Sequence, residues 1–322
     1  MNRRFIVGMT LCFSQFSFAT IKLTESLSLH SNPIIIAVID TGADIDHPEI
    51  RNNIWTNEGE TGLDLVGNNK ANNNIDDEGN GFVDDVHGWN FVDNSNRIED
   101  SHGHGTHISA IIRKEFLRLN PTNSSRTLPE PVRLMILKYY DPNGKLQDNI
   151  DYSTRAIDYA NKMHVNVINY SGGGYESSPS ELKALQNSER LGILVIAAAG
   201  NGKSNTDFRR YFPASYGLSN IISVAATNDA GELVSFSNFG RTTVDIAAPG
   251  DEIRSALPGK HFGIMSGTSQ ATAFVTGAAA KILATQNRPL KPQETLEQLL
   301  KISTVNKSLR GKTKHQLALL NE

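Results

Sequence analysis

Short apolar runs that alternate with helix-like stretches restrict the fold of this chain more than any other feature. The first run, residues 34–39 (IIIAVI), is apolar at every position. Runs of this kind are typical of strands buried on both faces, as in parallel sheets. Comparable runs, some interrupted by one polar residue, occur at 134–137, 165–168, 193–197 and 221–225.

Helical periodicity falls between and after these runs. We expect helices over residues 153–163, 179–190, 268–283 and 293–302. The third is rich in small residues, as a helix packed deep inside a domain is. Strands that alternate with helices predict a doubly wound sheet. The expected fold is therefore α/β and three-layered, with a mostly parallel sheet that carries helices on both faces.

Composition and charge narrow the class of partner. Hydrophobic residues make up 39% of the 322 residues and charged residues 20%, which is enough apolar side chain for a large core. The formal net charge is −3, and no long basic run occurs. We expect no nucleic-acid partner, because phosphate binding needs clustered lysine and arginine.

Residues 1–19 have the layout of a secretory signal peptide. Arg3 and Arg4 precede an apolar stretch. Small residues, Ser17 and Ala19, then occupy the two positions that a signal peptidase recognises. A buried helix or a membrane anchor is the alternative, although the stretch is short for a bilayer. We expect cleavage after Ala19, export to the periplasm or the medium, and no membrane contact afterwards. The only cysteine, Cys12, would leave with this segment.

Three residues in separate segments offer the groups that nucleophilic catalysis at serine needs. Asp40 ends the first apolar run, where α/β sheets place their functional side chains. His104 lies between two glycines at an expected helix start. Ser269 begins the small-residue helix, whose first N–H groups are free to meet an oxyanion. Taken singly, a turn aspartate and a helix-capping serine are also common.

Other residues compete with this set or extend it. Asn201 follows the run at 193–199 and carries an amide that suits an oxyanion, although asparagine is also frequent in turns. His102 and His107 are rivals of His104. The three histidines also raise the alternative of a metal site, but no H-E-x-x-H pattern is present.

Seven segments together resemble one family, the subtilases or subtilisin-like serine proteases. In chain order they are AVIDTG (37–42), GHGTHIS (103–109), VINYSGGG (167–174), GILVIAAAGN (192–201), FSNFG (236–240), VDIAAPG (244–250) and SGTSQATAFVTGAAA (266–280). The order of the candidate residues, aspartate then histidine then serine, is that of the subtilisin triad.

The resemblance implies a serine endopeptidase that works through an acyl-enzyme. Asp40 would orient His104, the general base, for attack by Ser269, and Asn201 would complete an oxyanion hole. An edge strand for the substrate is implied at Ser171, Gly172 and Gly173, with a wall of the primary specificity pocket at Ala198 and Gly200. Four residues could point into the floor of that pocket, and the sequence leaves the choice open: Asp207, Arg209, Arg210 and Tyr211.

Departures from the family pattern keep a second function open. Ala273 stands where the family usually has proline, and Phe274 where it often has histidine. We expect altered packing with retained chemistry, the alternative being a catalytically weak or inactive binding module. A lipase is disfavoured because no G-x-S-x-G surrounds Ser269.

Domain organisation follows from the same resemblance. We expect residues 20–322 to form one catalytic domain. Only residues 20–39 separate the predicted cleavage site from Asp40, so no prodomain is evident. The chain would then fold unaided or with a helper in trans. We expect a monomer that acts on polypeptide substrates.

An acidic stretch at 76–85 (DDEGNGFVDD) matches the first part of an EF-hand loop. Its oxygen ligands would be Asp76, Glu78, Asn80 and Asp84. His87 replaces the closing glutamate. Subtilases often bind structural calcium, which favours a calcium site, and a solvated polar turn is the alternative. We expect no cofactor to be required for the chemistry.

Overall fold

The computed structural model describes residues 33–118 and 131–319. The predicted signal peptide, residues 1–19, lies outside the described residues. Within these two ranges, no helix combines the length and the hydropathy that crossing a membrane requires.

Within the described residues, the five apolar runs form the strands β1, β3, β4, β5 and β6 of a nine-stranded sheet, whose order is β10-β11-β7-β6-β5-β4-β1-β3-β2. Its strands are β1 (Ile34–Asp40), β2 (Gly88–Asn90), β3 (Val132–Lys138), β4 (Val167–Tyr170), β5 (Leu194–Ala198), β6 (Ile221–Thr227), β7 (Ile246–Pro249), β10 (Thr304–Val305) and β11 (Leu317–Ala318). Every neighbouring pair is parallel except β10 with β11. The predicted parallel sheet is confirmed.

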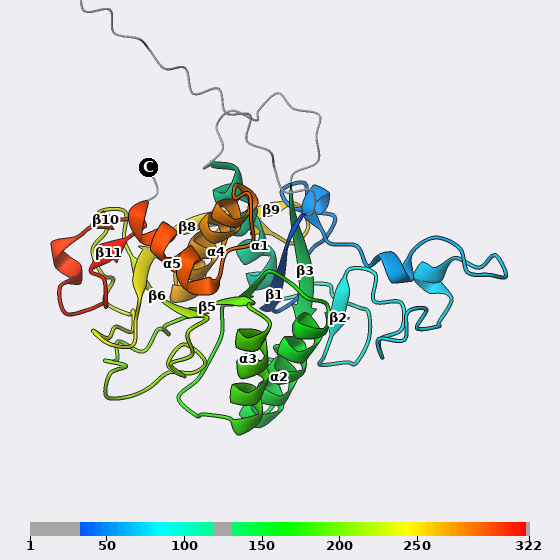
Figure 1. Ribbon diagram of the computed structural model, residues 1–322, viewed down its shortest axis with the longest axis horizontal. Coiled ribbons are helices and arrows are strands. Elements are labelled where there is room, and N and C mark those ends of the chain that lie inside the picture. The colour runs from blue at the N-terminus through cyan, green and yellow to red at the C-terminus, as the bar shows by residue number, and fades with distance from the viewer. Residues whose placement is uncertain (1–32, 119–130, 320–322) are drawn as a thin grey trace, which may run out of the picture.

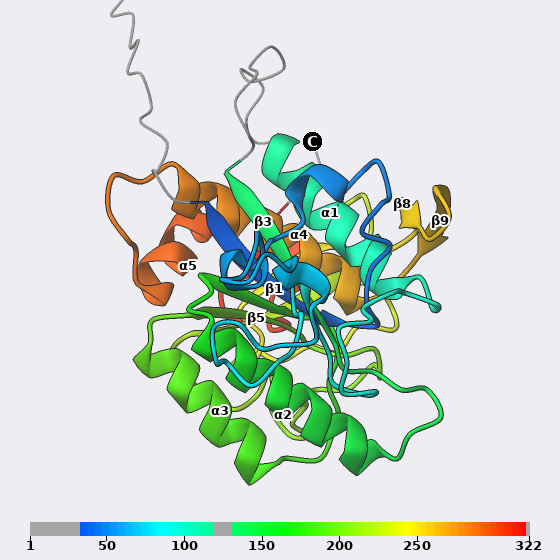
Figure 2. The ribbon, with the colours of Figure 1, turned by 90° about the vertical axis from the view of Figure 1, so that its right-hand side faces the viewer.

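Helices cover the two faces of the sheet in separate groups. The helices α1 (His104–Arg118), α4 (Thr268–Ala284) and α5 (Pro292–Lys301) lie on one face. The other face carries α2 (Leu146–Lys162) and α3 (Pro179–Arg190) (Figures 1 and 2). The three-layer prediction is therefore confirmed.

Strand β1 shows why its sequence is apolar throughout. Ile36 and Val38 belong to the core beneath α1 and α4, whereas Ala37 and Ile39 belong to the core beneath α2. All four side chains are fully buried. Successive residues of a strand point to opposite faces, so a strand between two helical layers needs apolar residues at every position.

Most expected bounds differ from the structure by one or two residues at an end, and those of β4 and α2 have a visible cause. Strand β4 was expected at 165–168 but runs from Val167 to Tyr170, because buried Asn169 is accommodated by bonds to two side chains. Helix α2 begins at Leu146, seven residues before the expected start at 153. Its first turn is largely polar and partly exposed, so it lacks the apolar spacing that marks the rest of the helix.

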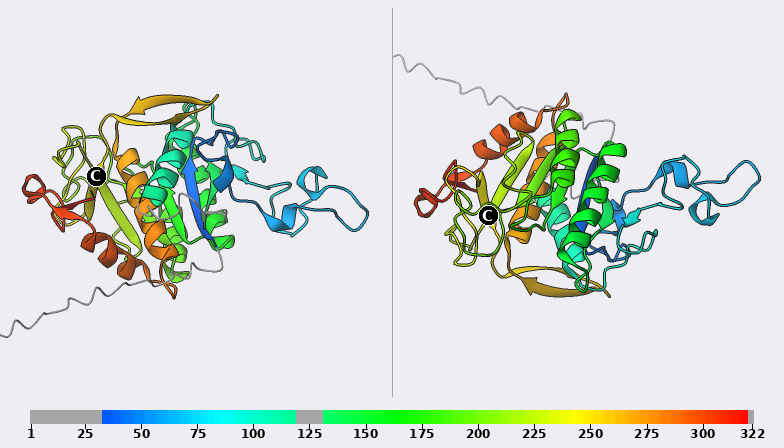
Figure 3. Two further views of the ribbon diagram at one scale, coloured as in Figure 1. Left: turned by 90° about the horizontal axis from the view of Figure 1, so that it is seen from above. Right: turned by 90° about the horizontal axis from the view of Figure 1, so that it is seen from below.

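Two features lie outside the three layers. The hairpin of β8 (Ile253–Leu257) and β9 (His261–Met265) is antiparallel and packs beside α1. The segment between β1 and β2 carries the short helices η1 (Arg51–Asn53), η2 (Glu58–Glu60) and η3 (Lys70–Asn72). The part with η2 and η3 projects from the body as an arm (Figures 1 and 3). A further short helix, η5 (Lys307–Leu309), lies near the end of the described chain.

The topology places three strand ends at one edge. Strand β1 is flanked by β3 and β4, and β5 lies next to β4. The chain passes from β1 to β3 on one side and continues with β4 on the other, so the strand order reverses beside β1. In open α/β sheets, ligands bind at the carboxyl ends of the strands where the order reverses. Asp40, Ser171 and Asn201 stand at or just beyond these ends.

Candidate active site

Asp40 and His104 come from separate elements and meet at this edge of the sheet. Asp40 is the last residue of β1, and His104 is the first residue of α1. The Nδ1 atom of His104 donates to Oδ1 of Asp40 over 2.7 Å. Because Nδ1 is occupied, Nε2 is the ring nitrogen that remains for a reacting hydroxyl.

The environment of His104 changes its affinity for a proton. Burial lowers the pKa of the ring, but the charge of Asp40 and its hydrogen bond act in the opposite direction, with a smaller contribution from Asp100. The net result is a pKa for His104 above the ordinary value of 6.5. The carboxylate therefore stabilises an imidazolium at this position.

Two glycines allow the strand end and the helix start to come this close. A Cβ on Gly105 would overlap the carbonyl oxygen of Gly42 and would lie 3.2 Å from Cβ of Asp40. Gly42 has a φ of +103°, and a Cβ there would overlap the carbonyl oxygen of Ile98. A side chain at Gly105 would therefore push α1 away from β1, and a side chain at Gly42 would push away the segment that leads into α1.

Asp100 organises the same region and was missed by the sequence reasoning. Its carboxylate accepts hydrogen bonds from Thr41 Oγ1 (2.9 Å), Gly103 N (2.7 Å) and Thr106 N (2.9 Å). Thr41 Oγ1 in turn accepts from Gly105 N. The buried carboxylate thus satisfies free N–H groups at the start of α1 and ties them to the end of β1. The sequence offered one signal for this role, namely the position of Asp100 four residues before His104.

Ser269 is the second residue of α4 and faces the same cavity as His104. Its Oγ donates to the carbonyl oxygen of Ser171 over 2.7 Å, and Ser171 Oγ donates to the carbonyl oxygen of Ser269 over 3.3 Å. The cavity has a volume of about 280 Å³. It is lined by Asp40, Thr41, His102, His104, Tyr139, Tyr140, Ser171, Gly172, Gly173, Tyr211 and Ser269. The three predicted catalytic residues are thus brought together.

Asn201 is held so that its amide nitrogen faces the start of α4. Its Oδ1 accepts from both N and Oγ1 of Thr268, each over 2.9 Å. The position that a Cβ on Gly267 would take lies 2.9 Å from Oε1 of Gln270, 3.3 Å from Nδ2 of Asn201 and 3.7 Å from the backbone N of Ser269. Two N–H donors, from Asn201 and Ser269, therefore lie near each other at the start of α4, as an oxyanion hole requires.

The rival histidines have different surroundings. His107 is fully buried, and its Nε2 bonds to the carbonyl oxygen of Ile253 on the hairpin over 3.0 Å. Burial is the main reason why its pKa is lowered to about 4. His102 is exposed and lines the cavity without contacting Asp40 through a hydrogen bond. Among the described histidines, His104 alone pairs with that carboxylate.

Of the substrate-binding residues that the resemblance implies, some line the catalytic cavity and others do not. Gly172 and Gly173 continue from Ser171 along the cavity wall. Gly200 borders the ring of Tyr211, and its N donates to Thr268 Oγ1. Ala198, the last residue of β5, is buried and does not line the cavity.

The predicted calcium ligands are not all brought together. Asp76 accepts from the N–H groups of Asn80 and Gly81, and Asp84 accepts from that of Asn74. Among the described residues, the group with metal-ligand spacing is instead Glu60, Glu78 and Asp85, whose ligand oxygens lie within 4.8 Å of one another. Asn80 borders this group, since its Nδ2 donates to Glu78 and Asp85.

Glu60 is the unusual member of this carboxylate group. It is fully buried, one oxygen accepts from Asp77 N over 2.9 Å, and Oε2 has no hydrogen-bond partner. Burial and the neighbouring carboxylates raise its pKa to about 7. No lysine or arginine forms an ion pair with the group in the part of the chain that the structure describes. The donors are hard oxygens, which suit calcium.

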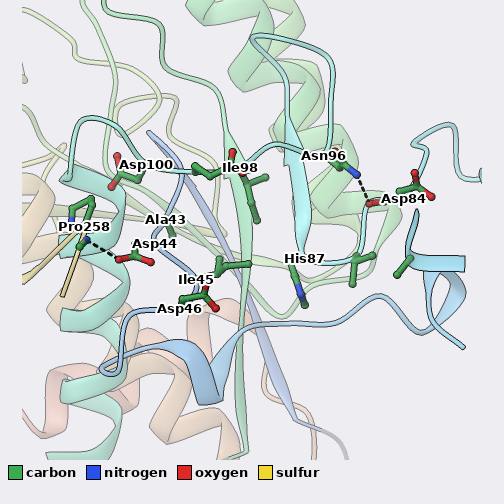
Figure 4. A pocket seen from close by; sticks show the side chains of 14 residues that line it. Ala43, Asp44, Ile45, Asp46, Asp84, His87, Asn96, Ile98, Asp100 and Pro258 are labelled. Carbon is green, nitrogen blue, oxygen red and sulfur yellow. Dashed lines mark hydrogen bonds between the residues drawn. The ribbon is translucent and has the colours of Figure 1, made fainter. Parts of the chain in front are cut away.

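A second and larger cavity, of about 680 Å³, has Asp100 in its lining (Figure 4). Carboxylates of Asp44, Asp46 and Asp84 border it together with His87. Asp44 Oδ2 accepts from Gly259 N, which ties one wall to the hairpin. Neither His104 nor Ser269 lines this cavity, so it is separate from the candidate catalytic cavity in spite of its size.

Known proteins resemble this chain over most of its length. Residues 31–318 match the Subtilase family. The major intracellular serine protease of Bacillus subtilis (strain 168) is 32% identical over 277 residues, which are 83% of this chain and 75% of the relative. The thermophilic serine proteinase of Bacillus sp. (strain AK1) is 35% identical over 79% of this chain, which spans 52% of that relative.

A solved structure supports the same relationship at the level of the fold. A cold adapted subtilisin-like serine proteinase superposes with a TM-score of 0.66 at 23% identity, covering 92% of this chain and 91% of the other. Together with the family match, this shows that the chain belongs to the subtilase family and is a subtilisin-like serine protease.

Proposed function

We propose that this protease is an endopeptidase that cleaves polypeptides with Asp40, His104 and Ser269 as its catalytic triad. The observation that carries the proposal is the 2.7 Å bond between Asp40 and His104 in a cavity that also exposes Ser269. A carboxylate that orients a histidine next to a serine is the arrangement that activates a hydroxyl for attack.

The reaction follows from these positions. Ser269 Oγ turns from Ser171 towards Nε2 of His104 when substrate binds, since catalytic bonds often form only in the complex. Nε2 takes the hydroxyl proton while Oγ bonds to the peptide carbonyl carbon. His104 then passes the proton to the leaving amine, and the C–N bond breaks to give an acyl-enzyme. Water attacks the ester by the same route and restores Ser269.

Asn201 and the start of α4 supply the electrostatic part of catalysis. The carbonyl oxygen gains negative charge as Oγ attacks, and N–H donors beside Ser269 would stabilise it. Nδ2 of Asn201 and the Ser269 N are these donors, and they lie 3.3 and 3.7 Å from the position that a Cβ on Gly267 would take. Donors fixed before the reaction stabilise such charge at little cost in reorganisation.

A second function is favoured by one observation. Ser269 Oγ bonds to Ser171 and not to His104, which is compatible with a subtilase fold that binds peptides without cutting them. The two replaced family positions, Ala273 and Phe274, belong to the core and do not line the catalytic cavity. They therefore give this alternative no support from the site itself.

We also infer a structural cation at Glu60, Glu78 and Asp85. Three carboxylates within 4.8 Å repel one another, and Glu60 Oε2 is buried without a partner. A divalent cation would offset both costs. Glu78 belongs both to this carboxylate group and to the ligand set predicted from the acidic loop. Substitutions at residues other than Glu78 therefore distinguish the two possible sites. The cation would hold the arm and would take no part in the peptide cleavage.

Export is proposed from the N-terminal sequence alone. Residues 1–19 read as a signal peptide, and the relatives named above include an intracellular protease, so family membership does not decide the compartment. The protein recovered from its native host should begin at Thr20. Mass determination of its N-terminal peptide measures this directly, and a chain that begins at Met1 in the cytosol would contradict export.

Removal of the nucleophile tests the triad. Ser269→Ala should lower kcat by about a millionfold, because no other group can form the acyl-enzyme. Asn201→Ala should lower kcat by about a hundred- to a thousandfold through loss of one oxyanion donor. The measurement combines peptide hydrolysis with labelling by a fluorophosphonate probe. A folded wild-type protein that neither hydrolyses peptides nor takes the label would favour the binding module.

The raised pKa of His104 predicts the acid side of the pH profile. A protonated ring cannot accept the Ser269 proton, so kcat/KM should fall as pH decreases through that pKa. The midpoint should lie above 6.5 in the wild type, because Asp40 favours the imidazolium. Asp40→Asn removes the charge, so its midpoint should move to lower pH while kcat falls by about 10⁴-fold. Equal midpoints in both proteins would contradict the role of Asp40.

Calcium removal tests the cation site. Calcium at about 100 times its Kd should stabilise the wild-type fold by about 2.7 kcal/mol, and chelation should reverse the gain. Glu60→Gln and Asp85→Asn should reduce the calcium-induced rise in Tm. Asp76→Asn is the matched control, because Asp76 lies outside the carboxylate group. Loss of the calcium response in Asp76→Asn alone would favour the loop set instead.

A further inference from the structure

Two glycines face the space where a substrate side chain would enter beside Ser269. Gly173 follows β4 along the catalytic cavity, and Gly200 follows β5 just before Asn201. In the proposed function, the backbone at these positions forms the walls of the pocket for the residue that precedes the cleaved bond. What lies between the two glycines therefore decides which side chains fit.

The ring of Tyr211 lies between them. A Cβ on Gly173 would be 2.7 Å from Cε1 of Tyr211, and a Cβ on Gly200 would be 2.9 Å from Cε2. These two ring carbons flank the phenol carbon on opposite sides, so the end of the ring spans the distance between the walls. Tyr211 also lines the catalytic cavity together with Ser269.

The other candidates for the pocket floor have partners elsewhere. The carboxylate of Asp207 accepts from the backbone of Arg241 and Thr242. The guanidinium of Arg209 lies 3.8 Å from the centre of the Tyr175 ring. Arg210 donates to the carbonyl oxygen of Ser215. Tyr211 is thus the one member of this group that lines the cavity.

Backbone and ring contacts hold Tyr211 in this position. The next residue, Phe212, exchanges two hydrogen bonds with Gly174, of 2.7 and 2.9 Å, which join the segment to the cavity wall. Tyr211 N donates to Ser215 Oγ over 3.2 Å, and Ser215 N donates back to the Tyr211 carbonyl oxygen. The Tyr175 ring packs edge-on against the Tyr211 ring at 5.2 Å. A large substrate side chain would have to disrupt these contacts to enter.

We propose that Tyr211 fills the primary specificity pocket and restricts cleavage to bonds that follow small residues, namely glycine, alanine and serine. This inference rests on the proposed endopeptidase function. The restriction is steric: the ring occupies the slot between Gly173 and Gly200, so closely that a Cβ on either glycine would overlap it. Small side chains need no part of that slot, whereas phenylalanine or leucine would compete with the ring for it.

The test uses matched peptide p-nitroanilides that differ only in the residue before the cleaved bond. The wild type should hydrolyse the alanine peptide with a kcat/KM at least about tenfold above that of the phenylalanine peptide. Tyr211→Gly should open the slot and raise the phenylalanine-to-alanine ratio by about a hundredfold. Tyr211→Phe is the control, because it keeps the ring and removes only the hydroxyl, so the preference for alanine should persist.

A fluorophosphonate probe separates failure of this inference from failure of the proposed function. The probe reacts with the activated serine and carries no residue for the pocket. If the wild type takes the label but shows no preference for small residues, the role of Tyr211 is overturned and the proposed triad stands. The same holds if Tyr211→Gly takes the label but keeps the phenylalanine-to-alanine ratio of the wild type. Tyr211→Gly could fail to fold. In that case the role of Tyr211 is overturned if the wild type and Tyr211→Phe both hydrolyse the phenylalanine peptide faster than the alanine peptide.

Discussion

The close approach of one helix start to one strand end is the constraint on which the site depends. Asp40 and His104 are far apart in sequence, and their side chains meet only because α1 begins against the end of β1. Gly105 has no side chain to separate the two backbones, and Gly42 gives the same freedom to the segment that leads into α1. Asp100 then holds the helix start by accepting its free N–H groups. The 2.7 Å bond is thus a product of backbone packing as much as of the two side chains.

The proposed nucleophile is positioned by an independent set of contacts on the other side of the cavity. Ser269 and Ser171 exchange hydrogen bonds that tie the start of α4 to the end of β4. Thr268 does the same between α4 and Asn201. Ser171, Ser269 and Thr268 are buried, where an unpaired polar group would be costly, whereas Asn201 is exposed. The serine and the proposed oxyanion donors are therefore fixed by one network of hydrogen bonds, and the proposed base by another.

Regions away from the triad give this subtilase its individual character. The arm between β1 and β2 gathers three carboxylates that come from two separate stretches of sequence, one of them in η2. The ring of Tyr211 occupies the space between Gly173 and Gly200, where, under the proposal above, it would narrow the range of substrates. The fold thus carries the chemistry at the sheet edge, and the connecting segments adjust stability and selectivity.

The sequence by itself determined the layers, the parallel sheet and the identity of the candidate triad. Periodicity reports which faces are buried, and the motifs around Asp40, His104 and Ser269 occur in an order that one family shares. Only the tertiary structure decided which carboxylates form a group and which side chain lies between Gly173 and Gly200. Glu60 joins the group, and Tyr211 takes its place between the glycines, through contacts between segments distant in sequence. Local patterns cannot report such contacts, because the direction of a loop side chain is set by the neighbours that pack around it.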